Sequence, residues 1–177
     1  MSAPDGAACS RRAVLGLGLV TAALLVRPAT AATTEVRLGA LAFQVPAAVT
    51  PVDDLSLGGG WQWRGASAPT GGTVVLARAD LAAAGPDEVL ALVLAGAGAG
   101  LLPGLRLGPR RRRTTPGGGH QVRAELGWAA DPGRPGRGTV LAAARPGRPA
   151  ALVAVLGGDA LTAGTVDAVL DSVRWTG

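Results

Sequence analysis

The second half of the chain carries three consecutive segments with a β-strand pattern. Apolar and polar side chains alternate over His120–Trp128, and apolar runs follow at Thr139–Ala144 and Ala150–Leu156. A period of two residues indicates a strand with one buried face. The connections Asp131–Gly138 and Arg145–Pro149 are rich in glycine and proline, which favour turns. Short turn-rich connections join antiparallel strands, so this region predicts an antiparallel meander.

The first part of the mature chain predicts further short strands. Apolar alternation from Glu35 to Val45 changes phase at Gly39–Ala40, which indicates two strands joined by a tight turn. Pro46 should end the second strand, because proline cannot donate to a sheet ladder. Ala47–Gly60 is predicted to be a loop. More strands are expected at Trp61–Trp63, at Thr73–Ala79, and from Leu105 into the arginines that follow.

Two segments have helical signals. The first begins at Pro86, and Asp87 and Glu88 fall in its first turn, where carboxylates interact favourably with the helix dipole. Glycines of the run Gly96–Gly100 should end it. Thr162 is expected to cap the second helix, which should end near Ser172 or Val173. Its apolar residues recur at helical spacing: Val166, Val169, Leu170 and Val173.

Residues 1–31 resemble a secretory signal peptide. A polar segment ends in Arg11 and Arg12, the 14-residue apolar run Ala13–Val26 follows, and Ala-Thr-Ala precedes a cleavage site after Ala31. Fourteen helical residues cover roughly 21 Å, less than the roughly 30 Å hydrocarbon core of a bilayer. We therefore expect cleavage and no stable membrane span afterwards; an uncleaved anchor is the alternative.

The same segment resembles the signal of the twin-arginine export pathway. Ser10-Arg11-Arg12-Ala13-Val14-Leu15 matches the pattern S-R-R-x-hydrophobic-L. An ordinary signal peptide with two arginines is the alternative. Either signal predicts an exported protein of the extracellular or cell-envelope space. Residues 32–177 are then expected to form a single domain.

Composition limits what this exported domain can do. After Ala31 the chain has no cysteine, so disulfides, thiolate metal ligands and a cysteine nucleophile are excluded. It keeps 14 arginines and 11 acidic residues, a net charge of +3, well below that of a nucleic-acid-binding domain. We expect no nucleic-acid partner. The expected partner is an unidentified envelope protein or an anionic polymer.

Few residues could support catalysis. His120 is the single histidine, and Ser67, in Gly-Ala-Ser-Ala-Pro, lacks the second glycine of a nucleophile elbow. We expect His120 to be a surface or edge residue. The Gly96–Gly100 run fails the dinucleotide fingerprint because Leu101 replaces its last glycine and a helix precedes it. No cofactor, metal site or catalytic residue is predicted. A small secreted hydrolase that combines His120 with Asp53, Asp54 or Glu125 is the alternative function.

Arg110, Arg111, Arg112 and Arg113 form the one cluster of charge in the chain. Successive strand residues face opposite sides, so four arginines on a strand cannot share one face. We therefore expect the cluster to span a strand end and an exposed turn. Its functional interpretation is an anion-contact patch for envelope polymers or lipid head groups, or a loop that docks the protein on a larger envelope complex. A solvated loop is the alternative.

The tryptophans have two interpretations. Trp61 and Trp63 are expected to share one face of a strand, with Trp128 on a neighbouring strand. They then either supply core volume or form the aromatic floor of a ligand cleft.

The chain has the early strand Phe43-Gln44-Val45-Pro46, a mid-chain helix, the meander, and the closing phrase Val169-Leu170-Asp171-Ser172-Val173-Arg174-Trp175. This order of elements resembles the PsbP-like fold, including exported actinobacterial proteins of the LpqN type. The resemblance implies an α+β domain in which helices flank a curved antiparallel sheet, an α/β/α sandwich. Members of this fold are mostly accessory or binding proteins without a shared active site. The resemblance therefore implies an exported, non-catalytic accessory or binding protein of the cell envelope.

Overall fold

The computed structural model describes residues 32–53, 60–68, 72–96, 103–131, 134–158 and 161–176. All of these residues belong to one compact unit, Ala31–Gly177. The export motif at Arg11 and Arg12 and the cleavage site after Ala31 lie outside the described residues, so both stay predictions.

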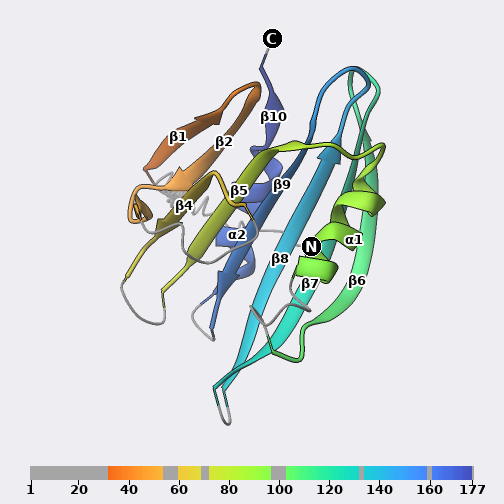
Figure 1. Cartoon of the computed structure of the whole chain (residues 1–177). Coiled ribbons are helices and arrows are strands. Elements are labelled where there is room, and N and C mark those ends of the chain that lie inside the picture. The colour runs from red at the N-terminus through yellow and green to blue at the C-terminus, as the bar shows by residue number, and fades with distance from the viewer. Residues whose placement is uncertain are drawn as a thin grey trace, which may run out of the picture. The chain divides into compact units, whose positions relative to one another are not determined.

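A seven-stranded sheet forms the centre of the unit (Figure 1). Every pair of neighbouring strands in it is antiparallel. Its order is β3 (Thr50–Pro51), β4 (Trp63–Ala66), β5 (Val74–Leu81), β9 (Ala150–Gly157), β8 (Arg134–Ala144), β7 (Gly119–Asp131) and β6 (Arg106–Thr115). The predicted meander is therefore confirmed, and it extends from β6 to β9.

Two predicted loops contain strand residues instead. The expected loop Asp131–Gly138 is wrong for most of its length, because β7 continues to Asp131 and β8 begins at Arg134. Pairing with the neighbouring strand holds this glycine- and proline-rich segment extended, with Trp128 opposite Gly136. Within the loop predicted for Ala47–Gly60, Thr50–Pro51 pair with β4 as the short strand β3.

A second, three-stranded sheet has the order β1 (Thr33–Leu38), β2 (Leu41–Pro46) and β10 (Arg174–Trp175). Gly39 closes the β1–β2 hairpin with a φ of 55°, a conformation that glycine adopts without strain. Arg37 and Arg174 both bond the carboxylate of Glu35. The hydrogen bond and charge of Arg37, and then the hydrogen bond and charge of Arg174, hold the pKa of Glu35 below its ordinary value.

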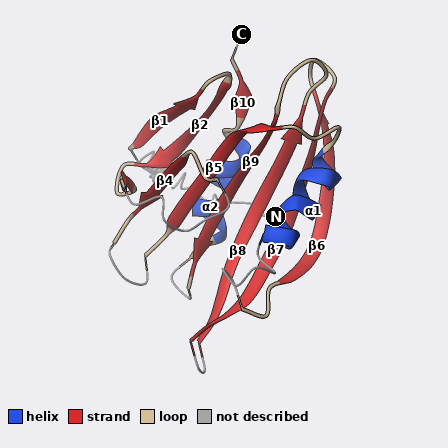
Figure 2. Ribbon diagram, in the orientation of Figure 1, coloured by secondary structure: helices blue, strands red, loops and turns tan. Residues whose placement is uncertain are grey.

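Both predicted helices are present and short (Figure 2). Helix α1 spans Pro86–Gly96, and α2 spans Ala163–Asp171. The Thr162 hydroxyl caps α2 by accepting a bond of 3.2 Å from the Thr165 amide. At the other end, the Ser172 hydroxyl donates to the Val169 carbonyl and accepts from the Gln44 amide, at 2.6 Å and 2.7 Å. Ser172 thereby joins the end of α2 to β2.

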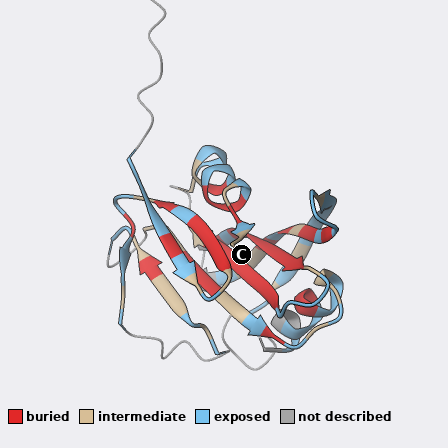
Figure 3. Ribbon diagram, turned by 90° about the horizontal axis from the view of Figure 1, so that it is seen from above, coloured by how far each residue is buried: buried red, intermediate tan, exposed pale blue. Residues whose placement is uncertain are grey.

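The large sheet buries apolar residues on both faces. One face packs against α1 through Val89 and Leu90. The other face packs against α2 and the small sheet, with Phe43 among the fully buried residues. Figure 3 shows buried residues along the inner strands and on the sides of the helices that face them.

The unit is therefore mostly antiparallel sheet with two short helices. The expectation of an α+β fold with an antiparallel sheet is confirmed. On the α2 side of the large sheet, the β1–β2–β10 sheet provides much of the packing. The unit therefore contains more sheet than the predicted arrangement, in which helices flank the sheet on both sides.

Candidate functional site

Strand β6 lies at one edge of the large sheet and carries all four clustered arginines. Its ten residues are exposed except Leu107 and Thr115, which are half-buried. The register with β7 shifts between Leu107 and Arg110, so a bulge separates Arg106 and Leu107 from the rest of the strand. From Arg110 to Thr115 the ladder is continuous. Pairing with β7 therefore fixes the backbone that carries the four arginines.

Two arginines of β6 point toward helix α1. The Arg112 guanidinium donates to the Asp87 carboxylate at 3.0 Å, and Arg110 lies 3.8 Å from the same oxygen. Asp87 belongs to the first turn of α1, where its charge also suits the helix dipole. One acidic residue thus partly balances two arginines, and all three side chains stay in contact with water.

The other two arginines point to the opposite side of the sheet. Arg113 donates two bonds to the Gln121 amide oxygen, at 2.8 Å and 3.2 Å. Arg111 stands opposite Arg123, whose guanidinium bonds Asp167 of α2 at 2.5 Å. Among the described residues Arg111 has no hydrogen bond or ion pair. Its guanidinium is therefore the one in the cluster that is left for an external anion.

The structure corrects the predicted place of the cluster. The cluster was expected at a strand end and an exposed turn, but all four arginines lie inside β6 and alternate between its two faces. The turn is confined to Pro116–Gly118, where two glycines take positive φ values. A strand can hold four arginines here because it is an edge strand and both its faces reach water.

Sequence reasoning missed both partners of the cluster. Gln121 could have been found, because a three-residue turn closed by Thr115 and Gly119 fixes Arg113 opposite it. Asp87 could not, because its contact with Arg112 depends on how α1 packs on the sheet.

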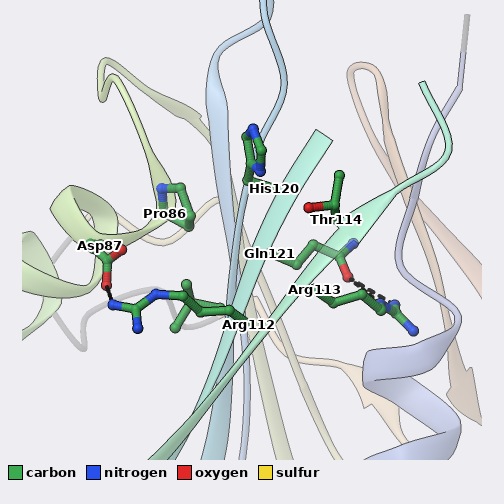
Figure 4. A pocket seen from close by; sticks show the side chains of 8 residues that line it. Pro86, Asp87, Arg112, Arg113, Thr114, His120 and Gln121 are labelled. Atoms are coloured by element: carbon green, nitrogen blue, oxygen red, sulfur yellow. Dashed lines mark hydrogen bonds and ion pairs between the residues drawn. The ribbon is translucent and has the colours of Figure 1, made fainter. Parts of the chain in front are cut away.

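A shallow pocket of about 330 Å³ adjoins the cluster, between the start of α1 and the end of the β6–β7 hairpin (Figure 4). Its lining includes Asp87, Arg112, Thr114 and His120. His120 is exposed at the start of β7, as expected for an edge or surface residue. No hydrogen bond joins it to a serine or a carboxylate of the described residues.

The residues of the hydrolase alternative are not brought together. Glu125 lies on β7 an odd number of residues from His120, so it points to the other face of the sheet. Asp53 follows β3, at the opposite edge of the sheet from β6 and β7. Asp54 lies outside the described residues.

The two serines that the structure describes have structural contacts elsewhere. The Ser67 hydroxyl accepts a bond from the Thr73 amide at 2.9 Å. Ser172 caps α2. Neither is near enough to His120 to bond it.

Trp61 and Trp63 do not share a face, contrary to the prediction. Trp61 packs against the apolar cluster on the α1 side, and Trp63 packs against the cluster on the other side. The Trp63 ring meets Phe43 edge to face, with ring centroids 5.6 Å apart. Trp128 joins the α1-side cluster. All three tryptophan rings are half-buried and pack against one or the other apolar cluster.

The described residues contain no group of three or more histidine, cysteine, aspartate or glutamate side chains placed to hold a metal ion. They also include no helix with the length and hydropathy needed to cross a bilayer.

Comparison with known proteins shows the fold. The structure is similar to the solution structure of cyanobacterial PsbP (CyanoP) from Synechocystis sp. PCC 6803, with a TM-score of 0.53 at 14% sequence identity. The match covers 82% of this chain and 93% of that one. No family model and no curated protein matches the sequence. The chain therefore has a PsbP-like fold.

Proposed function

We propose that the chain is an exported, non-catalytic accessory or binding protein of the cell envelope, which binds an anionic partner through the arginines of β6. The observation that carries the proposal is the run Arg110–Arg113 on an exposed edge strand. The likeness to LpqN-type exported proteins and the arrangement as an α/β/α sandwich belong to the same proposal.

The geometry of the strand supports binding. Guanidinium groups recognise carboxylates and phosphates through paired hydrogen bonds, and they do so best when they are held in place. Asp87 and Gln121 hold Arg112 and Arg113, while Arg111 has no bond within the described residues. The strand therefore presents two guanidinium groups that are held in place, those of Arg112 and Arg113. It also presents a third, that of Arg111, which has no bond within the described residues.

A small secreted hydrolase is the second candidate. The position of His120 in a pocket with Asp87 favours it, but the acid and base residues named for it stand on different faces and edges of the sheet. The four arginines of the binding function lie together on one strand, so we favour that function.

The binding function predicts that four substitutions release the protein from its partner. Arg110→Gln, Arg111→Gln, Arg112→Gln and Arg113→Gln together should lower the affinity for the envelope about fourfold or more, because four lost charge pairs of about 0.2–1 kcal/mol each weaken binding by about 0.8–4 kcal/mol in total. The measurement is quantitative fractionation of cells that express the full chain. Circular dichroism of the variant should be unchanged, because these side chains are exposed.

A matched variant controls for net charge. It replaces four exposed arginines outside β6: Arg37, Arg137, Arg148 and Arg174. This control should fractionate like the unsubstituted chain. Equal release of both variants would mean that overall charge and not β6 holds the protein, and the proposal would fail.

Export is tested separately at the N-terminus. The secreted chain should begin at Ala32, as measured by intact-mass spectrometry. Arg11→Lys with Arg12→Lys keeps the charge, yet should stop export if the twin-arginine route is used. Arg27→Lys is the matched control and should be exported normally. A membrane-bound chain that begins at Met1 or Ser2 would contradict the proposed cleavage.

A further inference from the structure

The outer edge of β6 has unpaired backbone as well as charge. In the order β3-β4-β5-β9-β8-β7-β6, only β7 lies beside β6 among the described strands. In an antiparallel strand, the N–H and C=O groups of alternate residues point to each side. Alternate residues of β6 therefore present amides and carbonyls outward that no described strand uses. Such an edge is a template for one more strand.

The usable part of this edge has a defined length. Pro109 has no N–H, and the bulge between Leu107 and Arg110 interrupts the ladder there. Beyond it, six residues from Arg110 to Thr115 pair regularly with β7. Six residues are about the length of an average strand. The edge can therefore accept an added strand of ordinary length.

The charges on the edge select the occupant. A second copy of β6 added antiparallel would bring arginine against arginine, and like charges on facing strands repel. An incoming strand with carboxylates on alternate residues would place them beside the guanidinium groups. Arg111 offers the better side for this contact, because Arg110 and Arg112 already share Asp87. The edge thus disfavours self-association and favours an acidic strand.

From this geometry we infer that β6 binds an extended acidic segment of a partner protein by β-strand addition along Arg110–Thr115. The inference rests on the proposed function, since it specifies the anionic partner as a polypeptide. A lipid or polymer anion would use the same guanidinium groups but would need none of the backbone groups. That difference makes the two kinds of partner distinguishable.

The test uses the full chain and a labelled eight-residue peptide in which glutamate and valine alternate. Fluorescence anisotropy should show saturable binding, and hydrogen exchange should show new protection of amides within Arg110–Thr115. Two more peptides carry N-methyl groups on the odd or on the even residues, with the charge unchanged. Because only alternate N–H groups of an added strand face the sheet, at least one methylated peptide should bind about tenfold more weakly.

Charge is tested by reversal at one position. Arg111→Glu should weaken binding of the acidic peptide about tenfold and should improve binding of the matching lysine peptide. Arg137→Glu makes the same charge change at an exposed position on β8 and should leave the affinity within about twofold of the original.

Three results would overturn the inference. They are no saturable binding of the acidic peptide, methylated peptides that both bind within about twofold of the parent, and equal effects of Arg111→Glu and Arg137→Glu. Vesicles rich in phosphatidylglycerol test the alternative that the anionic partner is a lipid. If they bind the chain through the four arginines while the peptide does not, strand addition is wrong and the proposed anionic partner stands. If neither binds, the proposed function fails as well.

Discussion

Phe43→Ala is expected to lower the free energy of unfolding by about 3–5 kcal/mol. Phe43 is fully buried in β2 and meets the Trp63 ring of β4 edge to face. Removal of the ring would leave a cavity where the small sheet packs on the large one. Since small domains are stable by only about 5–15 kcal/mol, this is a large share of the total. Urea unfolding followed by tryptophan fluorescence measures the change.

Leu92→Ala is the matched control for this loss. It also shortens a large apolar side chain, but Leu92 is 47% exposed on α1. Its effect should stay within about 0.5 kcal/mol. If Phe43→Ala were as mild as the control, the small sheet would not be fixed to the large one through this ring, and the packing described on the α2 side would be wrong.

Local sequence patterns predicted most of the strands and both helices. The alternation over His120–Trp128 needs only the period of the strand, and it persists in β7. The Thr162 cap and the apolar spacing of α2 are likewise contained in one short segment. The hairpin at Gly39 is local too. Each of these features depends on residues that are neighbours along the chain.

Predictions failed where a distant strand decides the conformation. Arg134–Gly138 has the composition of a loop, yet pairing with β7 and β9 makes it part of β8. Trp61 precedes β4 and packs on the side opposite Trp63, which alternation within a strand could not predict. Tertiary packing determined both, and neither segment carries a local signal for it.

The arginine cluster could be predicted only in part, because its position also depends on distant strands. Its four residues are evident in the sequence, but their alternation between faces follows only once they are known to lie on a strand. That β6 is an edge strand follows only from the order of the sheet, and the sequence does not determine which strand ends it. The exposed turn was therefore the simpler expectation for four consecutive charges. The contact between Arg112 and Asp87 needs the docked helix as well.

Gly138→Ala should destabilise the fold by about 1–3 kcal/mol, because strands β8 and β9 approach closely at this residue. A Cβ added to Gly138 would lie 2.7 Å from the carbonyl oxygen of Val155 and 3.3 Å from the Cα of Leu156. Both atoms belong to the backbone, so no side-chain rotation can relieve the contact. The strands must separate locally, and the bonds between them must lengthen.

Gly127→Ala provides the control in the neighbouring strand β7. No atom lies within 4 Å of the Cβ position at Gly127, and its φ is not in the left-handed region. Alanine there restricts the unfolded chain without a clash, so the variant should be neutral or more stable by up to about 1 kcal/mol. Urea unfolding of both variants under one set of conditions gives the difference. Because the two substitutions are chemically identical, opposite signs would locate the close approach at β8–β9. Equal stability of the two variants would mean that this pair of strands is more widely spaced than described.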